Sequence, residues 1–104
     1  MVTKIKKEAD VKKEIKTLFK TLELWHFMPS MSGYGTQGVP DFVGVSHGRG
    51  FAVETKFGKN NTTDWQNIQI AAIRAAGGKV WVVNEKNIEN FRTEFSEWAA
   101  NASH

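Results

Sequence analysis

Residues 38–56 read GVPDFVGVSHGRGFAVETK, and this stretch decides the fold that we expect. Two runs rich in β-branched and aromatic residues, at 41–45 and 51–57, flank the turn formers SHGRG. Such an arrangement is typical of a β-hairpin, so we predict two antiparallel strands joined by a turn over 46–50. The stretch also carries two carboxylates and a lysine, which a strand does not need in order to bury apolar side chains.

Asp41, Glu54 and Lys56 are predicted to meet at the end of the hairpin that lies away from the turn. In the expected register Val43 faces Val53, which sets Asp41 abreast of the end of the second strand. Neighbouring strands run about 5 Å apart, and alternate residues of one strand point to the same side. We therefore expect the two carboxylates and the ammonium group to gather on one patch of the sheet.

The segment before the hairpin is predicted to form a helix, a strand and a loop. Apolar residues recur at three- and four-residue spacing over 4–22, which indicates a helix with one apolar stripe: Val11, Ile15, Leu18, Phe19 and Leu22. Residues 23–28 (ELWHFM) are typical of a strand, and 29–40 of a loop rich in Gly, Ser and Pro.

Glu8 interrupts the division of this helix into a polar and an apolar side. It lies three residues before Val11 and seven before Ile15, which places it on the apolar stripe. A carboxylate that points into the body of a protein is costly unless a cation meets it. Glu14 falls nearer the margin of the stripe. Lysines crowd the remaining surface, and either a solvated face or contact with phosphates explains them.

The segment after the hairpin is predicted to form a helix, a strand and a second helix. Thr63 is expected to cap a helix over 64–76, which Gly77-Gly78 ends. A short buried strand over 79–83 and a helix over 87–99 follow. The tryptophans of this region are expected in the core or at an interface: Trp65, Trp81 and Trp98. The strand–helix–strand passage predicts a parallel pair beside the hairpin, hence an α/β fold with a mixed sheet flanked by helices.

The composition fits one small folded domain spanning 1–104. The chain is 40% hydrophobic, which favours a folded protein, and its net charge of +3 is a mild basic bias that suits an anionic partner. The absence of cysteine excludes disulfides and cysteine-ligated zinc. No apolar run approaches the roughly 20 residues of a membrane span, and the N-terminus lacks the apolar segment of a signal peptide, so we expect a cytoplasmic protein without membrane contact.

The acidic pair Asp41 and Glu54 has the chemistry of a divalent-metal site. Adjacent carboxylates repel each other unless they share a proton or a cation. Oxygen ligands suit Mg²⁺ or Mn²⁺, which commonly take one or two carboxylates together with water and substrate phosphate. A lysine beside the ion, such as Lys56, can stabilise charge on a phosphate or help position the attacking water. Together these groups suit hydrolysis of a phosphodiester. The alternative is structural, with Glu54 and Lys56 as an ion pair on an ordinary strand.

The motifs Pro40-Asp41 and Glu54-Thr55-Lys56 resemble those of the PD-(D/E)XK nuclease superfamily. The longer run from GVPDF through TTDWQ, which ends in Gln66, to AAGGKVWVV is most similar to the virus-type replication-repair nuclease (VRR-NUC) domain. The resemblance covers essentially the whole chain. It implies a restriction-endonuclease-like α-β-β-β-α-β core with an additional C-terminal helix, and a metal-dependent deoxyribonuclease.

The resemblance also implies roles for single residues. Asp41 and Glu54 would be ligands of Mg²⁺ or Mn²⁺, and Lys56 the catalytic lysine. In the family a glutamate of the first helix completes the acidic cluster; its spacing here points to Glu8 as a metal ligand, with Glu14 as the alternative. Gln66 resembles the family's helix glutamine near the active site, and its structural interpretation is a solvent-facing residue or a cap contact.

Further residues are expected to contact DNA. Family members often have glutamine where this chain has Lys12, which leaves the DNA contacts of the first helix open. The residues that we assign to DNA binding are Lys12, Lys13, Tyr34, Thr36 and Arg49. Arg49 lies at the predicted tip of the hairpin, where simple exposure is the alternative. The loop SGYGTQG lacks the Gly-Lys-Ser/Thr ending of a phosphate-binding P-loop, so no nucleotide cofactor is expected.

The expected function is a DNA endonuclease selective for branched duplexes. Small stand-alone members of the family are associated with homodimers that act on four-way junctions, so the resemblance implies a homodimer similar to a Holliday-junction resolvase. The small format also suggests a phage or mobile element, which would place the protein in the host cytoplasm. Two alternatives stay open: a nuclease of other specificity (nicking, flap or end-directed) and a catalytically inert DNA-binding module.

Overall fold

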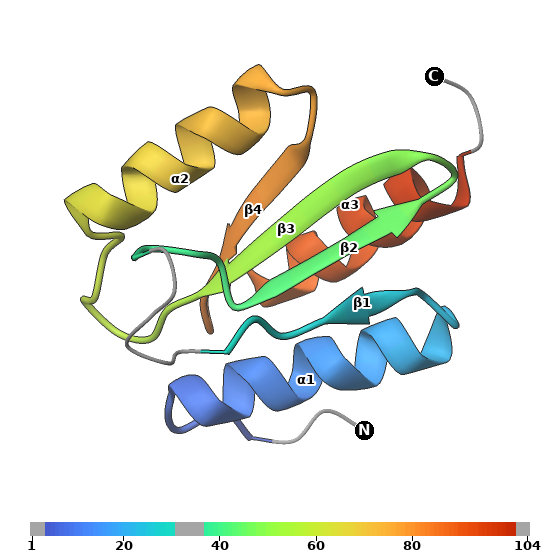
Figure 1. Cartoon of the computed structure of the whole chain (residues 1–104). Coiled ribbons are helices and arrows are strands. Elements are labelled where there is room, and N and C mark those ends of the chain that lie inside the picture. Colours follow the sequence, from blue (N-terminus) through green and yellow to red (C-terminus); the bar gives the residue numbers. More distant parts are fainter. Residues whose placement is uncertain (1–3, 31–36, 102–104) are drawn as a thin grey trace.

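The computed structural model describes residues 4–30 and 37–101, which form a four-stranded mixed sheet and three helices (Figure 1). The elements are α1 (Glu8–Thr21), β1 (His26–Phe27), β2 (Phe42–Ser46), β3 (Arg49–Thr55), α2 (Asp64–Ala75), β4 (Lys79–Val83) and α3 (Ile88–Ala100). The predicted order of elements and the mixed α/β class are confirmed. None of these helices is both long and apolar enough to cross a bilayer.

The sheet has the strand order β1-β2-β3-β4. β1, β2 and β3 pair antiparallel in turn, whereas β3 and β4 run parallel. A parallel neighbour requires a crossover connection, and α2 supplies it. Because β3 has a partner on each side, the residues at its end are held by two ladders.

The larger part of the core lies between the sheet and the helices α1 and α3. The predicted apolar stripe of α1 is confirmed, with Leu22 partly buried and these residues buried: Val11, Ile15, Leu18 and Phe19. Aromatic rings fill the space above β2 and β3, where Phe51 meets Phe95 edge to face with centroids 5.1 Å apart. Edge-to-face pairs of this kind stabilise a core beyond the area that they bury.

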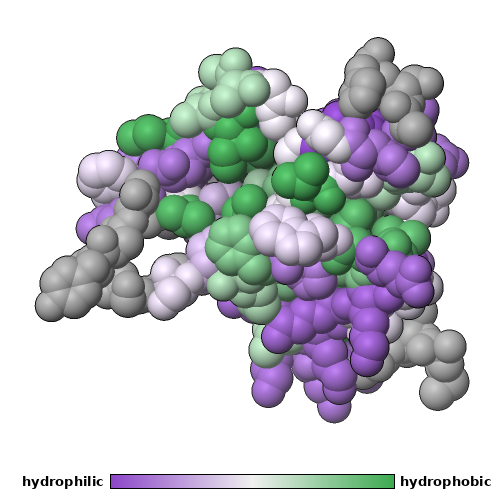
Figure 2. All heavy atoms as spheres, turned by 45° about the vertical axis from the view of Figure 1, so that its right-hand side comes forward, coloured by the Kyte–Doolittle hydropathy of each residue, from purple (hydrophilic) through white to green (hydrophobic). Residues whose placement is uncertain are grey.

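The other side of the sheet is packed more thinly. There α2 contributes Ile70 to a small cluster with Ala52 of β3 and Val80 of β4. Large apolar side chains of β2, α2 and the segment at β1 are more than a third exposed: Trp25, Phe27, Val45, Trp65 and Ile68. Figure 2 shows apolar residues on the upper part of one face of the molecule, above a hydrophilic region where α1 lies in Figure 1.

The turn of the hairpin is shorter than the sequence suggested. It consists of His47 and Gly48, which have positive φ angles of 52° and 77°. Two-residue turns with positive φ at both positions match the right-handed twist of the flanking strands. The ladder therefore runs further toward the turn, so Val43 faces Ala52. The predicted pairing with Val53 is wrong by one residue, and the predicted five-residue turn is wrong.

Two predicted boundaries at the N-terminal end are also wrong. α1 begins at Glu8 and not at residue 4, because Lys7 is extended. The strand predicted over 23–28 is reduced to His26–Phe27. Glu23 has a φ of 52°, in the left-handed region, where a strand cannot continue.

The cap of α2 is as predicted, but one of its aromatic residues is not. The Thr63 hydroxyl accepts a hydrogen bond from the backbone amide of Gln66. The side-chain oxygen of Gln66 accepts one from the backbone amide of Thr63, which completes a capping box. Trp65 is 56% exposed, so of the two places predicted for it, the core or an interface, the core is wrong. It lies five positions before buried Ile70, which turns it away from the sheet.

Candidate active site

The candidate site lies where β2 begins and β3 ends. Phe42 pairs with Val53, and the same register continued by one residue sets Asp41 opposite Glu54. The predicted proximity of Asp41 and Glu54 therefore does not depend on the one-residue error in the hairpin register. Lys56 follows β3 directly, and its amide donates to the Val83 carbonyl at 2.9 Å, which extends the ladder with β4.

Asp41 is anchored by Thr55. Its Oδ2 accepts hydrogen bonds from the Thr55 amide at 2.8 Å and from the Thr55 hydroxyl at 2.6 Å. The other oxygen, Oδ1, lies 3.6 Å from the Lys12 Nζ. The aspartate is thus fixed by one oxygen, while the second faces the partly exposed side chain of Lys12.

Glu54 is the most deeply buried acidic group of the site, with a side chain that is 4% exposed. Its Oε2 accepts a hydrogen bond from the Gln66 Nε2 at 2.7 Å and lies 3.4 Å from the Lys56 Nζ. Its Oε1 is buried and accepts no hydrogen bond from the described residues. Natural proteins rarely leave a buried polar atom without a partner, and such atoms are often explained by a role in the site or by an ion.

Burial raises the pKa of Glu54 from 4.5 to about 7. The negative charge of Asp41 adds to this rise, whereas Lys56 opposes it. A carboxyl with such a pKa changes its charge near neutral pH, and a bound cation would favour the charged form.

Gln66 fulfils both interpretations that the sequence left open. Its Oε1 caps α2, and its Nε2 donates to Glu54. One side chain therefore links the start of α2 to the acidic pair. The Thr63 backbone amide fixes the Oε1 of this side chain, and the Glu54 carboxylate fixes its Nε2.

Glu8 does not join the acidic pair directly. Its side chain is 38% exposed and lies 3.7 Å from the Lys12 Nζ, so the expectation that it points into the body of the protein is wrong. The reason is its position as the first residue of α1, before the buried part of the stripe begins. The alternative carboxylate, Glu14, is held by Arg92 of α3 at 2.9 Å.

The structure therefore supports an acidic pair more than an acidic triad. Within the described part of the chain, no three acidic or histidine side chains are grouped so that they could hold a metal ion. Two carboxylates are sufficient for Mg²⁺, which keeps several waters and binds substrate phosphate. The oxygens that could hold such an ion are Asp41 Oδ1, which accepts neither of the Thr55 hydrogen bonds, and the unpaired Glu54 Oε1.

The residues assigned to DNA contact are spread over the molecule. Lys13 is exposed on α1. Arg49 is not an exposed tip, because its guanidinium stacks 4.3 Å from the Trp98 ring and donates to the Trp98 carbonyl at 2.7 Å. It lies at the turn end of β3, about 16 Å along the sheet from Asp41 at the usual rise per residue. Tyr34 and Thr36 lie outside the described residues.

Two contacts of the site were not foreseen from the sequence. Strand alternation places the Thr55 side chain on the face of the sheet opposite Glu54. The sequence therefore gave no reason to expect hydrogen bonds from Thr55 to Asp41. Asp41 can reach Thr55 because Asp41 precedes β2, and its backbone therefore does not have to follow the alternation of the strand. The ion pairs of Lys12 depend on how α1 lies against the sheet, which periodicity alone does not give.

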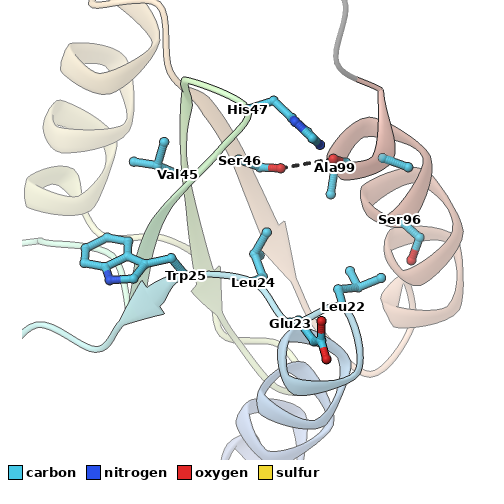
Figure 3. Close-up of a pocket in the computed structure, with 10 residues that line it drawn as sticks. Leu22, Glu23, Leu24, Trp25, Val45, Ser46, His47, Ser96 and Ala99 are labelled. Carbon is cyan, nitrogen blue, oxygen red and sulfur yellow. Dashed lines mark hydrogen bonds between the residues drawn. The ribbon is translucent and has the colours of Figure 1, made fainter.

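A hollow of about 450 Å³ lies at the turn end of the sheet, between the end of α1 and α3 (Figure 3). Its lining includes Trp25, Ser46 and His47, and the Ser46 hydroxyl is occupied by the Ala99 carbonyl at 3.0 Å. Neither Asp41 nor Glu54 lines it. The orphaned carboxylate oxygen thus lies away from this hollow, and the acidic pair remains the stronger candidate.

Comparison with family models, with curated proteins and with solved structures finds no match to this chain. The candidate site is therefore assigned from its geometry. That geometry joins Asp41, Glu54, Lys56 and Gln66 at one end of β3.

Proposed function

We propose that this chain is a metal-dependent nuclease that hydrolyses phosphodiester bonds in DNA. Asp41 and Glu54 would hold Mg²⁺ or Mn²⁺, and Lys56 and Gln66 complete the active site. The observation that carries the proposal is the buried Glu54 Oε1, which has no hydrogen-bond donor among the described residues although Asp41 and Lys56 are close. A divalent ion is the partner that would satisfy both this oxygen and the mutual repulsion of the carboxylates.

The site's own residues divide the work. Asp41 is aimed by Thr55, and Glu54 is aimed by Gln66, so both carboxylates are positioned before any ligand arrives. Lys56 is only 12% exposed and lies beside Glu54, where its ammonium can stabilise negative charge on a substrate phosphate. When bound, a divalent ion supplies Lewis-acid polarisation of the phosphate and lowers the pKa of a coordinated water.

The substrate that we propose is a branched DNA duplex, bound by a homodimer. Two features support a nucleic-acid substrate: the net charge of +3 and the lysine-rich surface of α1. The resemblance to VRR-NUC domains favours branched over linear DNA. One copy of this domain offers little surface for a bent substrate, and two copies would present two active sites to two of its strands.

A second candidate is a DNA-binding module that does not cleave. The observation that favours it is the Lys12 ammonium, which lies within 4 Å of both Glu8 and Asp41 and offsets their charge without a metal. Against it stand the intact Asp41, Glu54 and Lys56, since loss of a ligand would be the simplest route to inactivity.

The test is a cleavage assay on labelled four-way junction, flap, linear duplex and single-stranded DNA, each with Mg²⁺, Mn²⁺ or EDTA. We expect metal-dependent paired nicks in the junction. In Asp41→Asn, which keeps an oxygen for the Thr55 donors, cleavage should fall on the order of a thousandfold because several kcal/mol of charge stabilisation are lost. DNA binding should stay nearly unchanged.

The outcomes separate the candidates. Cleavage of another substrate would replace the junction preference and keep the nuclease. Binding of DNA without cleavage of any substrate would favour the inert module. Cleavage that persists in Asp41→Asn, or in EDTA, would refute this site.

A further inference from the structure

Lys12 reaches from α1 to the acidic pair. Its Nζ lies 3.6 Å from Asp41 Oδ1 and 3.7 Å from Glu8 Oε2. Oδ1 is the oxygen that Thr55 leaves available, because both Thr55 donors bind Oδ2. The ammonium thus contacts two carboxylates at once.

The position of Lys12 sets it in competition with a divalent cation. Like charges a few ångströms apart repel each other, and solvent screening reduces this repulsion without removing it. The Lys12 side chain is 33% exposed, and its ion pairs are of the kind that contribute little to stability. Its flexible stem therefore allows the ammonium to leave at modest cost.

Lys56 differs from Lys12 in each of these respects. It is more deeply buried, it follows a central strand, and it pairs with Glu54 on the oxygen that Gln66 also binds. Its contact leaves Glu54 Oε1 without a donor among the described residues. Lys56 is thus a fixed part of the site, whereas Lys12 is a cation that can be exchanged.

We infer that Lys12 is a resident competitor of the divalent ion. In the metal-free protein it pairs with both Asp41 Oδ1 and Glu8 Oε2, which lowers the affinity of the acidic pair for divalent cations. Metal binding at Asp41 then requires that the ammonium move away. This inference rests on the proposed metal site at Asp41 and Glu54, and it assigns Lys12 to control of that site and not primarily to DNA contact.

The experiment measures Mn²⁺ binding without DNA at pH 8, by the electron paramagnetic resonance signal of the free ion. The variant Lys12→Gln removes the ammonium, and Lys16→Gln is the matched control, because Lys16 is an exposed residue one turn further along α1. We expect Lys12→Gln to bind Mn²⁺ more tightly than wild type on the order of tenfold, and Lys16→Gln to stay within about twofold. Lys12→Arg keeps the charge and should not show the gain.

A second variant tests the part played by Glu8. When Glu8→Gln is added to Lys12→Gln, a part of the gain should disappear, because the released Glu8 can then no longer contribute a charged oxygen. A gain that is fully retained would overturn this part of the inference. Glutamine and lysine have similar helix propensities, and thermal melts without metal show whether each variant is folded.

These variants distinguish a failure of the competitor role of Lys12 from a failure of the proposed metal site. If wild type binds Mn²⁺ and Asp41→Asn does not, the metal site stands. Equal affinities of Lys12→Gln and Lys16→Gln, or weaker binding by Lys12→Gln, would then overturn the competitor role alone. If neither wild type nor Lys12→Gln shows binding that depends on Asp41, the metal site is wrong and the competitor role with it.

Discussion

The two faces of the sheet are built on opposite principles. On one face α1 and α3 enclose buried aromatic rings that contact one another around Phe95. On the other face α2 covers only a small cluster around Ala52, and Val45 of β2 remains exposed. The first face supplies most of the apolar burial, so most of the stability of the fold is expected from it.

The contrast explains where a costly acidic site can be tolerated. Glu54 belongs to the same strand as Phe51 and Val53, but alternation directs it to the side of α2, where Gln66 meets it. The packed face holds the strand rigid, while the thin face leaves room for charge and for a ligand. A site of fixed geometry thus lies on a strand whose other side is core.

The strongest test of the contrast is a truncation on each face. Phe95→Ala removes a fully buried ring from the packed face and should lower the free energy of unfolding by about 3–5 kcal/mol. Ile68→Ala, on α2, removes a side chain that is 56% exposed and should change it by less than about 0.5 kcal/mol. Urea denaturation measures both. Similar losses in the two variants would show that the faces do not differ as described.

The raised pKa of Glu54 should make the free energy of unfolding depend on pH. The folded pKa of Glu54, about 7, lies above its ordinary value of 4.5, so the folded state binds more protons between these values. The contribution of Glu54 to stability should therefore be largest below pH 4.5 and fall as pH rises to about 7, by up to about 3 kcal/mol. Glu54→Gln should remove this part of the pH dependence, stabilise the protein at pH 8, and abolish cleavage.

Urea denaturation from pH 4.5 to 8 measures this effect, with Glu97→Gln as the control because Glu97 is an exposed residue of α3. The control should keep the wild-type slope. Mn²⁺ should stabilise wild type at pH 8 and not Glu54→Gln, since binding to the folded state alone raises stability. An unchanged pH slope in Glu54→Gln would mean that another group carries it.

Much of this arrangement could be predicted from the sequence because it depends on short-range periodicity. The two-residue period of a strand places Glu54 and Lys56 on one side, and the structure brings them within 3.4 Å. The capping pattern at Thr63 placed Gln66 in the first turn of α2, although it did not show that its amide reaches Glu54. The apolar stripe of α1 identified the packed face.

The errors arose where periodicity carries no information. The period of 3.6 residues assigned Glu8 to the apolar side, but it could not show that the helix begins there, before the buried part. The register of the hairpin depended on a histidine with positive φ, which lacks the usual Asn-Gly or Asp-Gly signal. The Lys12 contact depends on how α1 packs on the sheet, which is a long-range property.

A smaller effect distinguishes two glycines of the hairpin. A Cβ on Gly44 would lie 2.4 Å from the Phe51 ring and 2.5 Å from the Trp25 carbonyl oxygen, on the packed side. Gly44→Ala should therefore cost about 1–3 kcal/mol. A Cβ on Gly50 of the neighbouring strand would meet nothing within 4 Å, so Gly50→Ala should be neutral or slightly stabilising. Thermal melts of both variants test this, and equal costs would contradict the assigned packing.

The smallest expected effect separates the two roles of Gln66. Gln66→Ala and Thr63→Ala each break the capping box of α2 and should each cost about 1 kcal/mol of stability. Only Gln66→Ala also removes the donor to Glu54 Oε2, so only this variant should lower Mn²⁺ affinity or cleavage, by about 10–100-fold. Urea denaturation and Mn²⁺ titration on the same samples measure the two effects. If both variants lose affinity equally, the position of α2 matters to the site and the Gln66 side chain does not.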